Sequence, residues 1–250
     1  MELGLVSATF KDRPYTEVIS IACNAGLSCI EWSENHHVPA TDINKAKEIA
    51  EYSSQNGIKV LGYGSYFKLG CNMDIMPSLN NAKAMGAKFV RIWGGTKEPS
   101  QIDDSERLAL LEEIKSVCKL AKEKGLEIVF EWHRKTITQE LDYALSFISD
   151  ANCSNLKCLW QTNPDISESQ RYKEISELVS KDILTYVHVF HWDDMGKRRP
   201  FNEGIEEWEK LLAVSKNSCE AYMLEFVLNN TEEQFYEDAK FLKKLCRGEI

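Results

Sequence analysis

Polar side chains that could do acid, base or metal chemistry come late in short apolar runs of this 250-residue chain. Glu131 closes the run "EIVFE", His133 follows two residues later, and Glu225 closes "AYMLE". Carboxylates and imidazoles exchange protons with substrates and also bind divalent cations. Two glutamates that face each other in a confined space repel unless a cation or a proton lies between them. The fold must decide whether these groups meet. The other polar residues in such late positions are Glu31, Arg91, Gln161 and His188.

The elements that position these residues follow a repeating pattern. Apolar runs alternate with amphipathic, helix-like segments, and a glycine stop followed at once by a strand recurs in "QNGIKV", "AMGAKFV" and "EKGLEIV". Asp103 and Thr231 each precede a Glu or Gln by three residues, as helix N-caps do. The eight candidate strands begin at Leu3, Ser28, Ile58, Lys88, Glu127, Leu156, Leu184 and Ala221.

Strand starts lie roughly 25 to 39 residues apart, which is the length of one βα unit. Eight such units in a chain of this size predict an α/β fold, a (β/α)8 TIM barrel forming a single domain over residues 1–250. An open doubly wound sheet is the alternative, but no GxGxxG motif follows the first run. In a barrel, active sites lie at the C-terminal ends of the strands, where the late polar residues would converge.

Strand alternation then decides which side chains point inward. One assignment turns all the late polar residues into the barrel and their apolar neighbours toward the helices. The Glu31 and Arg91 side chains could instead simply form an ion pair. Among the tryptophans at strand ends, Trp93 is expected to line the pocket.

The stretch "VHVFHW" contains two histidines three residues apart, which would share a face on a helix but point to opposite sides of a strand. On the expected strand His188 points inward, and the two rings are not expected to bind one metal. His191 falls where the strand runs into a loop, where it would touch substrate or cap the barrel edge.

The composition of the chain limits the classes of molecule that it is expected to bind. A net charge of -9 argues against nucleic acid, and no apolar run reaches the length of a membrane span. Without a signal-peptide pattern the chain is expected to be cytoplasmic, and its eight cysteines lack a CxxC spacing. The sequence leaves the oligomeric state open, a homo-oligomer included.

Several segments, in order and spacing, resemble the xylose isomerase-like TIM barrels, a family of sugar isomerases, ketose 3-epimerases, a dehydroshikimate dehydratase and endonuclease IV. The resemblance covers nearly the whole chain. The segments that carry it are "IACNAGLSCIEW", "AKAMGAKFVRIWGG", "FEWH", "YVHVFHWDD", "EGIEEWEKLL" and "MLEF".

The resemblance implies one divalent ion (Mn, Mg, Co or Zn) held by Glu131, His188, Glu225 and a residue of the sixth strand. That position, an aspartate in the family, is Gln161 here, which offers a neutral carbonyl oxygen. It further implies that Glu131 and Glu225 act as acid and base on opposite sides of a substrate. His133, Trp93, Glu31 and His191 are the expected substrate contacts.

The expected function is therefore a sugar or sugar phosphate isomerase or epimerase that removes a proton next to a carbonyl through an enediolate. A lyase or dehydratase acting on a polyhydroxy acid with the same site is one alternative. A barrel that has lost its metal and only binds a sugar is another, and Gln161 is the residue that favours it. Endonuclease chemistry is disfavoured, because it needs many histidines and a basic surface, whereas this acidic chain has five histidines.

Overall fold

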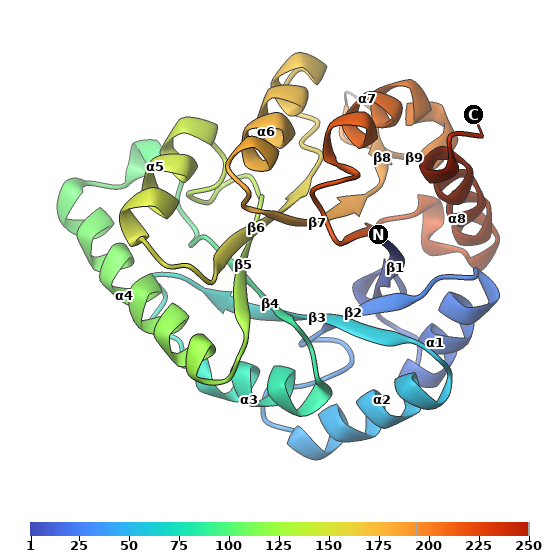
Figure 1. Cartoon of the computed structure of the whole chain (residues 1–250), viewed down its shortest axis with the longest axis horizontal. Coiled ribbons are helices and arrows are strands. Elements are labelled where there is room, and N and C mark those ends of the chain that lie inside the picture. Colours follow the sequence, from blue (N-terminus) through green and yellow to red (C-terminus); the bar gives the residue numbers. More distant parts are fainter. Residues whose placement is uncertain (194, 250) are drawn as a thin grey trace.

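The predicted barrel is present in the computed structural model, which describes residues 1–193 and 195–249. Eight parallel strands close in the order β1-β10-β7-β6-β5-β4-β3-β2, with helices surrounding them (Figure 1). Closure excludes the open sheet and confirms the (β/α)8 fold. The barrel strands are β1 (Glu2–Val6), β2 (Cys29–Ser33), β3 (Lys59–Lys68), β4 (Phe89–Trp93), β5 (Glu127–Glu131), β6 (Leu156–Gln161), β7 (Leu184–Val189) and β10 (Ala221–Leu224).

The helices alternate with the strands as the apolar periodicity predicts. Gly57, Gly86 and Gly125 follow helix ends with φ between 69° and 73°, a left-handed conformation that costs glycine little. The Asp103 and Thr231 side chains accept hydrogen bonds from the backbone N–H groups three residues later, which confirms both N-caps. The helices are α1 (Tyr15–Asn24), α2 (Ile43–Gln55), α3 (Met76–Met85), α4 (Asp104–Glu123), α5 (Leu141–Ala151), α6 (Glu168–Ser180), α7 (Ile205–Ser215) and α8 (Glu232–Arg247). None of the helices in the described part of the chain is long and apolar enough to cross a membrane.

Two apolar layers hold the fold together. The larger lies between the strands and the helices and includes Trp32, Trp132 and Trp160, as strand alternation predicts. The smaller fills the inside of the barrel below the late polar residues. Its members are Val6, Cys29, Leu61, Phe89, Val129, Leu159, Tyr186, Ala221 and Met223.

One local feature departs from the expectation. The seventh barrel strand ends at Val189, and a small antiparallel hairpin of β8 (His191–Trp192) and β9 (Arg198–Arg199) follows it. His191 pairs with Arg199 and Trp192 with Arg198. The strand alternation that places His188 therefore cannot be extended to His191.

Candidate active site

Six polar residues form a layer directly above the apolar interior of the barrel. Each lies two positions after an inward apolar residue of its strand, as Glu131 does after Val129 and His188 after Tyr186. Because side chains alternate along a strand, this spacing turns all of them inward. Each is at most 6% exposed. The layer, called here the polar ring, consists of Glu31, Arg91, Glu131, Gln161, His188 and Glu225.

Ion pairs link the members of the polar ring. Arg91 Nε lies 2.9 Å from Glu31 Oε1, so these two inward residues form an ion pair, and Arg91 also pairs with Glu131. His188 Nε2 lies 3.0 Å from Glu31 and its Nδ1 3.2 Å from Glu225. The Glu31 carboxylate thus bridges the Arg91 guanidinium and the His188 imidazole from the inner side of the ring.

Gln161 joins the polar ring through its amide. Its Nε2 donates a 3.1 Å hydrogen bond to Glu131 Oε1, while its Oε1 is buried and has no hydrogen-bond partner among the described residues. Glu131 is therefore held on both carboxylate oxygens, by Gln161 on one and by Arg91 on the other.

The pairing shifts the ionisation of the buried groups. Burial opposes the charge of Glu31, but Arg91 and His188 together lower its pKa to about 2. Burial likewise disfavours the His188 imidazolium, yet Glu31 and Glu225 raise the pKa of this histidine to about 10. Glu131 and Glu31 outweigh burial at Arg91 and raise its pKa well above the ordinary value. The groups stabilise one another in their charged forms.

Glycine on β3 leaves the space for this network. A Cβ on Gly64 would lie 2.6 Å from Arg91 Nη2 and 2.7 Å from Glu31 Oε1. Real side chains do not approach so closely, so the Arg91–Glu31 pair needs a glycine here.

The expected substrate contacts separate into two groups. Glu31 is fully buried beneath the ring, so its position favours support of other residues over contact with substrate. The His191 ring lies against the backbone of Gly204, where an added Cβ would meet its Nδ1 at 2.3 Å. Its contacts are thus separate from those of His188, in agreement with the expectation that the two histidines do not pair.

His133 and Trp93 do lie at the mouth of the barrel. The two rings stack with centroids 4.7 Å apart, and Lys68 Nζ lies 4.9 Å from the Trp93 centroid. His133 Nδ1 is 2.6 Å from the Arg134 carbonyl, to which it can only donate. A neutral His133 therefore keeps its Nε2 as an acceptor for a substrate hydroxyl.

Two adjoining cavities open at this end of the barrel. The inner one, about 80 Å³, is lined by Glu131 and Gln161 and by three aromatic residues that the sequence interpretation missed: Phe190, Trp192 and Phe226. The outer one, about 800 Å³, is lined by Trp93 and polar residues, and His133 borders both. In the sequence, Trp192 is marked only by its position directly after an apolar run. His191 has the same mark, so the sequence did not show which of the two side chains borders the cavity.

The predicted metal ligands offer donor types that suit a divalent cation, but both oxygens of Glu131 are already bonded, to Arg91 and to Gln161. Gln161 Oε1 is a buried atom without a hydrogen-bond partner among the described residues, whereas His188 Nδ1 and Glu225 Oε2 are buried 3.2 Å from each other. Glu31 holds the other ring nitrogen of His188, as carboxylates commonly do for metal-binding histidines. The described residues contain no cluster of three His, Cys, Asp or Glu side chains arranged for a metal, and the fourth expected ligand, Gln161, offers an amide oxygen instead of a carboxylate. Oxygen-rich donors with one imidazole suit Mn²⁺ or Mg²⁺.

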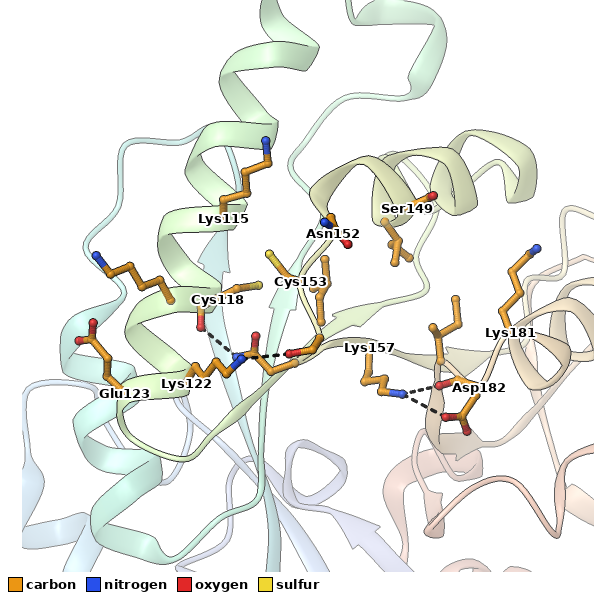
Figure 2. Close-up of a pocket in the computed structure, with 16 residues that line it drawn as sticks. Lys115, Cys118, Lys122, Glu123, Ser149, Asn152, Cys153, Lys157, Lys181 and Asp182 are labelled. Carbon is orange, nitrogen blue, oxygen red and sulfur yellow. Dashed lines mark hydrogen bonds and ion pairs between the residues drawn. The ribbon is translucent and has the colours of Figure 1, made fainter.

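A hollow at the opposite end of the barrel does not share this chemistry. It measures about 770 Å³ and is lined by lysines beside the starts of β6 and β7 (Figure 2). Helices α4, α5 and α6 end there, and cations near helix C-termini offset the partial negative charge of the last carbonyls. Lys157, for example, donates to the Asp182 carbonyl. Lys122, in the last turn of α4, and Lys181, the C-cap of α6, therefore have a structural explanation. The other lysines of the hollow are Lys115, Lys119 and Lys157.

Comparison with known proteins agrees with the fold and the arrangement of the strands. The family model described as xylose isomerase-like TIM barrel matches residues 19–245. The chain therefore belongs to the xylose isomerase-like TIM barrel family.

Individual relatives are distant but match over their whole length. The chain is 18% identical to a 3-dehydroshikimate dehydratase of Bacillus anthracis, over 97% of this chain and 96% of the relative. The crystal structure of a probable 3-DHS dehydratase of the same organism is similar with a TM-score of 0.83 and 16% identity, covering 97% of this chain and 99% of the other.

Other solved structures of similar fold include an epimerase and a magnesium complex. A D-allulose 3-epimerase from Methylomonas sp. has a TM-score of 0.74 at 14% identity, with 98% of each chain covered. A xylose isomerase-like TIM barrel protein from Mycobacterium smegmatis, solved with magnesium, has a TM-score of 0.69 at 13% identity and covers 98% of this chain and 96% of the other.

Proposed function

We propose that this protein is an enzyme that removes a proton from the carbon next to a carbonyl group of a small polyhydroxylated compound, a sugar or sugar phosphate, and returns it as an isomerase or epimerase. The supporting observation is the placement of Glu131 and Glu225. Both belong to the polar ring, on β5 and just after β10, and two strands separate them in the closed barrel. A substrate between them would meet one carboxylate on each side.

In this mechanism one glutamate takes the proton from carbon, and an enediolate forms on the substrate. The other glutamate delivers a proton to the opposite face of the same carbon in an epimerisation. In an isomerisation it delivers the proton to the neighbouring carbon, and the hydroxyl proton passes to the former carbonyl oxygen. Arg91 and Gln161 hold the Glu131 carboxylate in place, and His188 holds Glu225. His133 Nε2 would accept a hydrogen bond from a substrate hydroxyl.

Glu131, Gln161, His188 and Glu225 would hold a divalent ion. When bound, the ion would supply positive charge beside the carbonyl oxygen and so favour loss of the neighbouring proton. Glu31, enclosed below the ring, would orient His188 rather than touch substrate.

The test is solvent exchange in D₂O with candidate ketoses, measured for the Glu131→Gln and Glu225→Gln variants. Loss of a positioned acid or base should slow deuterium incorporation by about 100-fold or more. Glu174→Gln is the matched control, because Glu174 is also a buried glutamate but lies on α6 among the helix-layer residues. Unchanged exchange in both ring variants would sink the assignment.

Dehydration is the second candidate, favoured by the likeness to 3-dehydroshikimate dehydratase. Both reactions begin with loss of the same kind of proton, and in the dehydratase the enolate expels a β-hydroxyl as water. Mass analysis of products separates them, because an isomerase yields equal mass and a dehydratase loses one water. Incubation with 3-dehydroshikimate and with D-allulose tests both directly.

A further inference from the structure

Three aromatic rings form one wall of the inner cavity. The Phe190 centroid lies 5.2 Å from those of Trp192 and Phe226, and the Trp192 and Phe226 centroids are 5.5 Å apart. The same cavity is lined by Glu131 and Gln161, so the wall borders the proposed reaction site. These three residues are called here the aromatic wall.

The backbone around the aromatic wall fixes its rings. The hairpin of β8 and β9 carries Trp192, and the neighbouring His191 side chain lies against Gly204. Phe226 has φ 50°, a left-handed conformation that is unfavourable for a bulky residue and persists only where the surroundings hold it. The Arg198 guanidinium lies 4.9 Å from the Phe226 centroid and bonds Asn230 at 2.7 Å.

The indole N–H of Trp192 is buried and has no hydrogen-bond partner among the described residues. Other tryptophans satisfy theirs, since Trp160 donates to Glu174 and Trp208 to the Phe190 carbonyl. Leaving a buried donor unpaired is unfavourable, and an oxygen-bearing ligand in the adjoining cavity would supply the missing acceptor. Trp32 Nε1 and Trp93 Nε1 are also unpartnered, but Trp32 lies in the core between strands and helices, and Trp93 lines the outer cavity rather than the inner one.

Trp93, the expected stacking residue, is less free to take this role. Its ring is already contacted by His133 and Lys68, and it lines the outer cavity. Indole rings pack well against the C–H faces of polyols, which are apolar between their hydroxyl groups. In the inner cavity, beside Glu131 and Gln161 of the polar ring, the aromatic surface is that of Phe190, Trp192 and Phe226.

We propose that Trp192 is a substrate-binding residue whose indole N–H donates to a substrate oxygen while its ring, with that of Phe226, packs against a C–H face of the substrate. The ligand class is a small polyhydroxylated ketone or acid. The inference rests on the proposed function for the choice of ligand, but not on the acid and base roles of the glutamates.

Binding is tested by following the indole N–H signals in ¹⁵N-labelled protein by NMR. Trp192→Phe and Trp32→Phe each remove one signal and so identify the two that matter. Addition of D-allulose or 3-dehydroshikimate should shift the Trp192 signal and leave that of Trp32 unchanged. Failure of the Trp192 signal to move with either probe overturns the inference, whatever the glutamate variants show.

Kinetics provide the second measurement on whichever probe the enzyme converts. Trp192→Phe keeps a ring but removes the donor, and loss of one hydrogen bond should raise KM about tenfold. Trp32→Phe, matched in chemistry and remote from the cavity, should leave KM unchanged. An equal effect of both variants would indicate general destabilisation and contradict the proposal. If exchange persists in the glutamate variants but the Trp192 signal shifts, only the catalytic assignment fails.

Discussion

Gln161 determines the charge of the polar ring. Three carboxylates in the ring face the guanidinium of Arg91 and the imidazole of His188. An aspartate at position 161 would place a fourth carboxylate beside Glu131, which would require more compensating positive charge. The amide instead donates to Glu131 and keeps a carbonyl oxygen free. The substitution thus lowers the attraction for a cation without removing an oxygen ligand.

Glu174 is a buried carboxyl outside the ring, 2% exposed, which accepts a hydrogen bond from Trp160. Burial raises its pKa from 4.5 to about 7, although hydrogen bonds from Trp160 and Trp132 oppose the shift. The folded state therefore keeps its proton where the unfolded chain has lost it. This group's contribution to stability is fully present below pH 4.5 and is lost as the pH rises from about 4.5 to 7.

We expect Glu174→Gln to remove this pH dependence. At pH 8 the variant should be more stable than the wild type by about 2–3 kcal/mol, and near pH 4 the two should be similar. Urea denaturation at both pH values measures the difference. A variant that is equally or less stable at pH 8 would show that the carboxylate is better accommodated in the folded state than its surroundings indicate.

At the scale of elements, the end of β7 has the largest consequence for the site. The strand stops at Val189, and the β8–β9 hairpin turns Trp192 toward the inner cavity and His191 toward Gly204. A single residue more or less in β7 would change which of these side chains borders the cavity, because alternation has a period of two.

Strand β3 leaves space for the Arg91 and Glu31 side chains of the polar ring, because it carries a glycine at position 64. The variant Gly64→Ala tests this spatial role. The new Cβ would overlap two buried side-chain groups, those of Arg91 and Glu31. We expect a loss of about 1–3 kcal/mol of unfolding free energy and lower activity. Gly62→Ala is the matched control, two residues earlier on the same strand, where the nearest atoms lie at an ordinary 3.5 Å. Equal thermal stability of both variants would refute the spatial role given to Gly64.

At the scale of the whole molecule, barrel closure is what assembles the polar ring. Glu31 and His188 are 157 residues apart in the chain, yet their side chains lie 3.0 Å apart. β2 and β7 are not neighbours in the barrel, so their contact runs across its interior. The ring therefore exists only once all eight strands are in place.

Because four strands supply the proposed metal ligands, an ion that binds them should stabilise the whole fold. Mn²⁺ at 100 times its Kd would add about 2.7 kcal/mol, and each kcal/mol raises the Tm of a chain of this size by about 2–4 °C. We expect Mn²⁺ to raise Tm in chelator-free buffer, and Gln161→Asp to show the rise at lower ion concentration. Sodium chloride at matched ionic strength is the control.

Metal analysis of protein purified without chelator complements this measurement. A stoichiometric divalent ion supports the enzyme proposal. No bound ion, together with a Tm that Mn²⁺ does not change in either protein, would favour the sugar-binding barrel without catalysis.

The sequence by itself determined the barrel, its helix ends and the inward direction of the polar ring. These properties are local: glycine stops, N-caps and strand alternation depend on residues close together in the chain. Strand alternation therefore predicts Glu131 and Gln161 on the inner face and their chain neighbours Trp132 and Trp160 on the outer one.

Only the tertiary structure decided which side chains of the polar ring and of the barrel mouth are enclosed, covered or exposed to a cavity. Glu31 lies enclosed under two cations, the Trp93 ring is covered by His133 and Lys68, and Trp192 rather than His191 borders the inner cavity. Each outcome depends on groups from distant parts of the chain, or on where a strand ends. Those contacts are set by closure of the barrel, because burial and charge pairing act between whichever side chains the fold brings together.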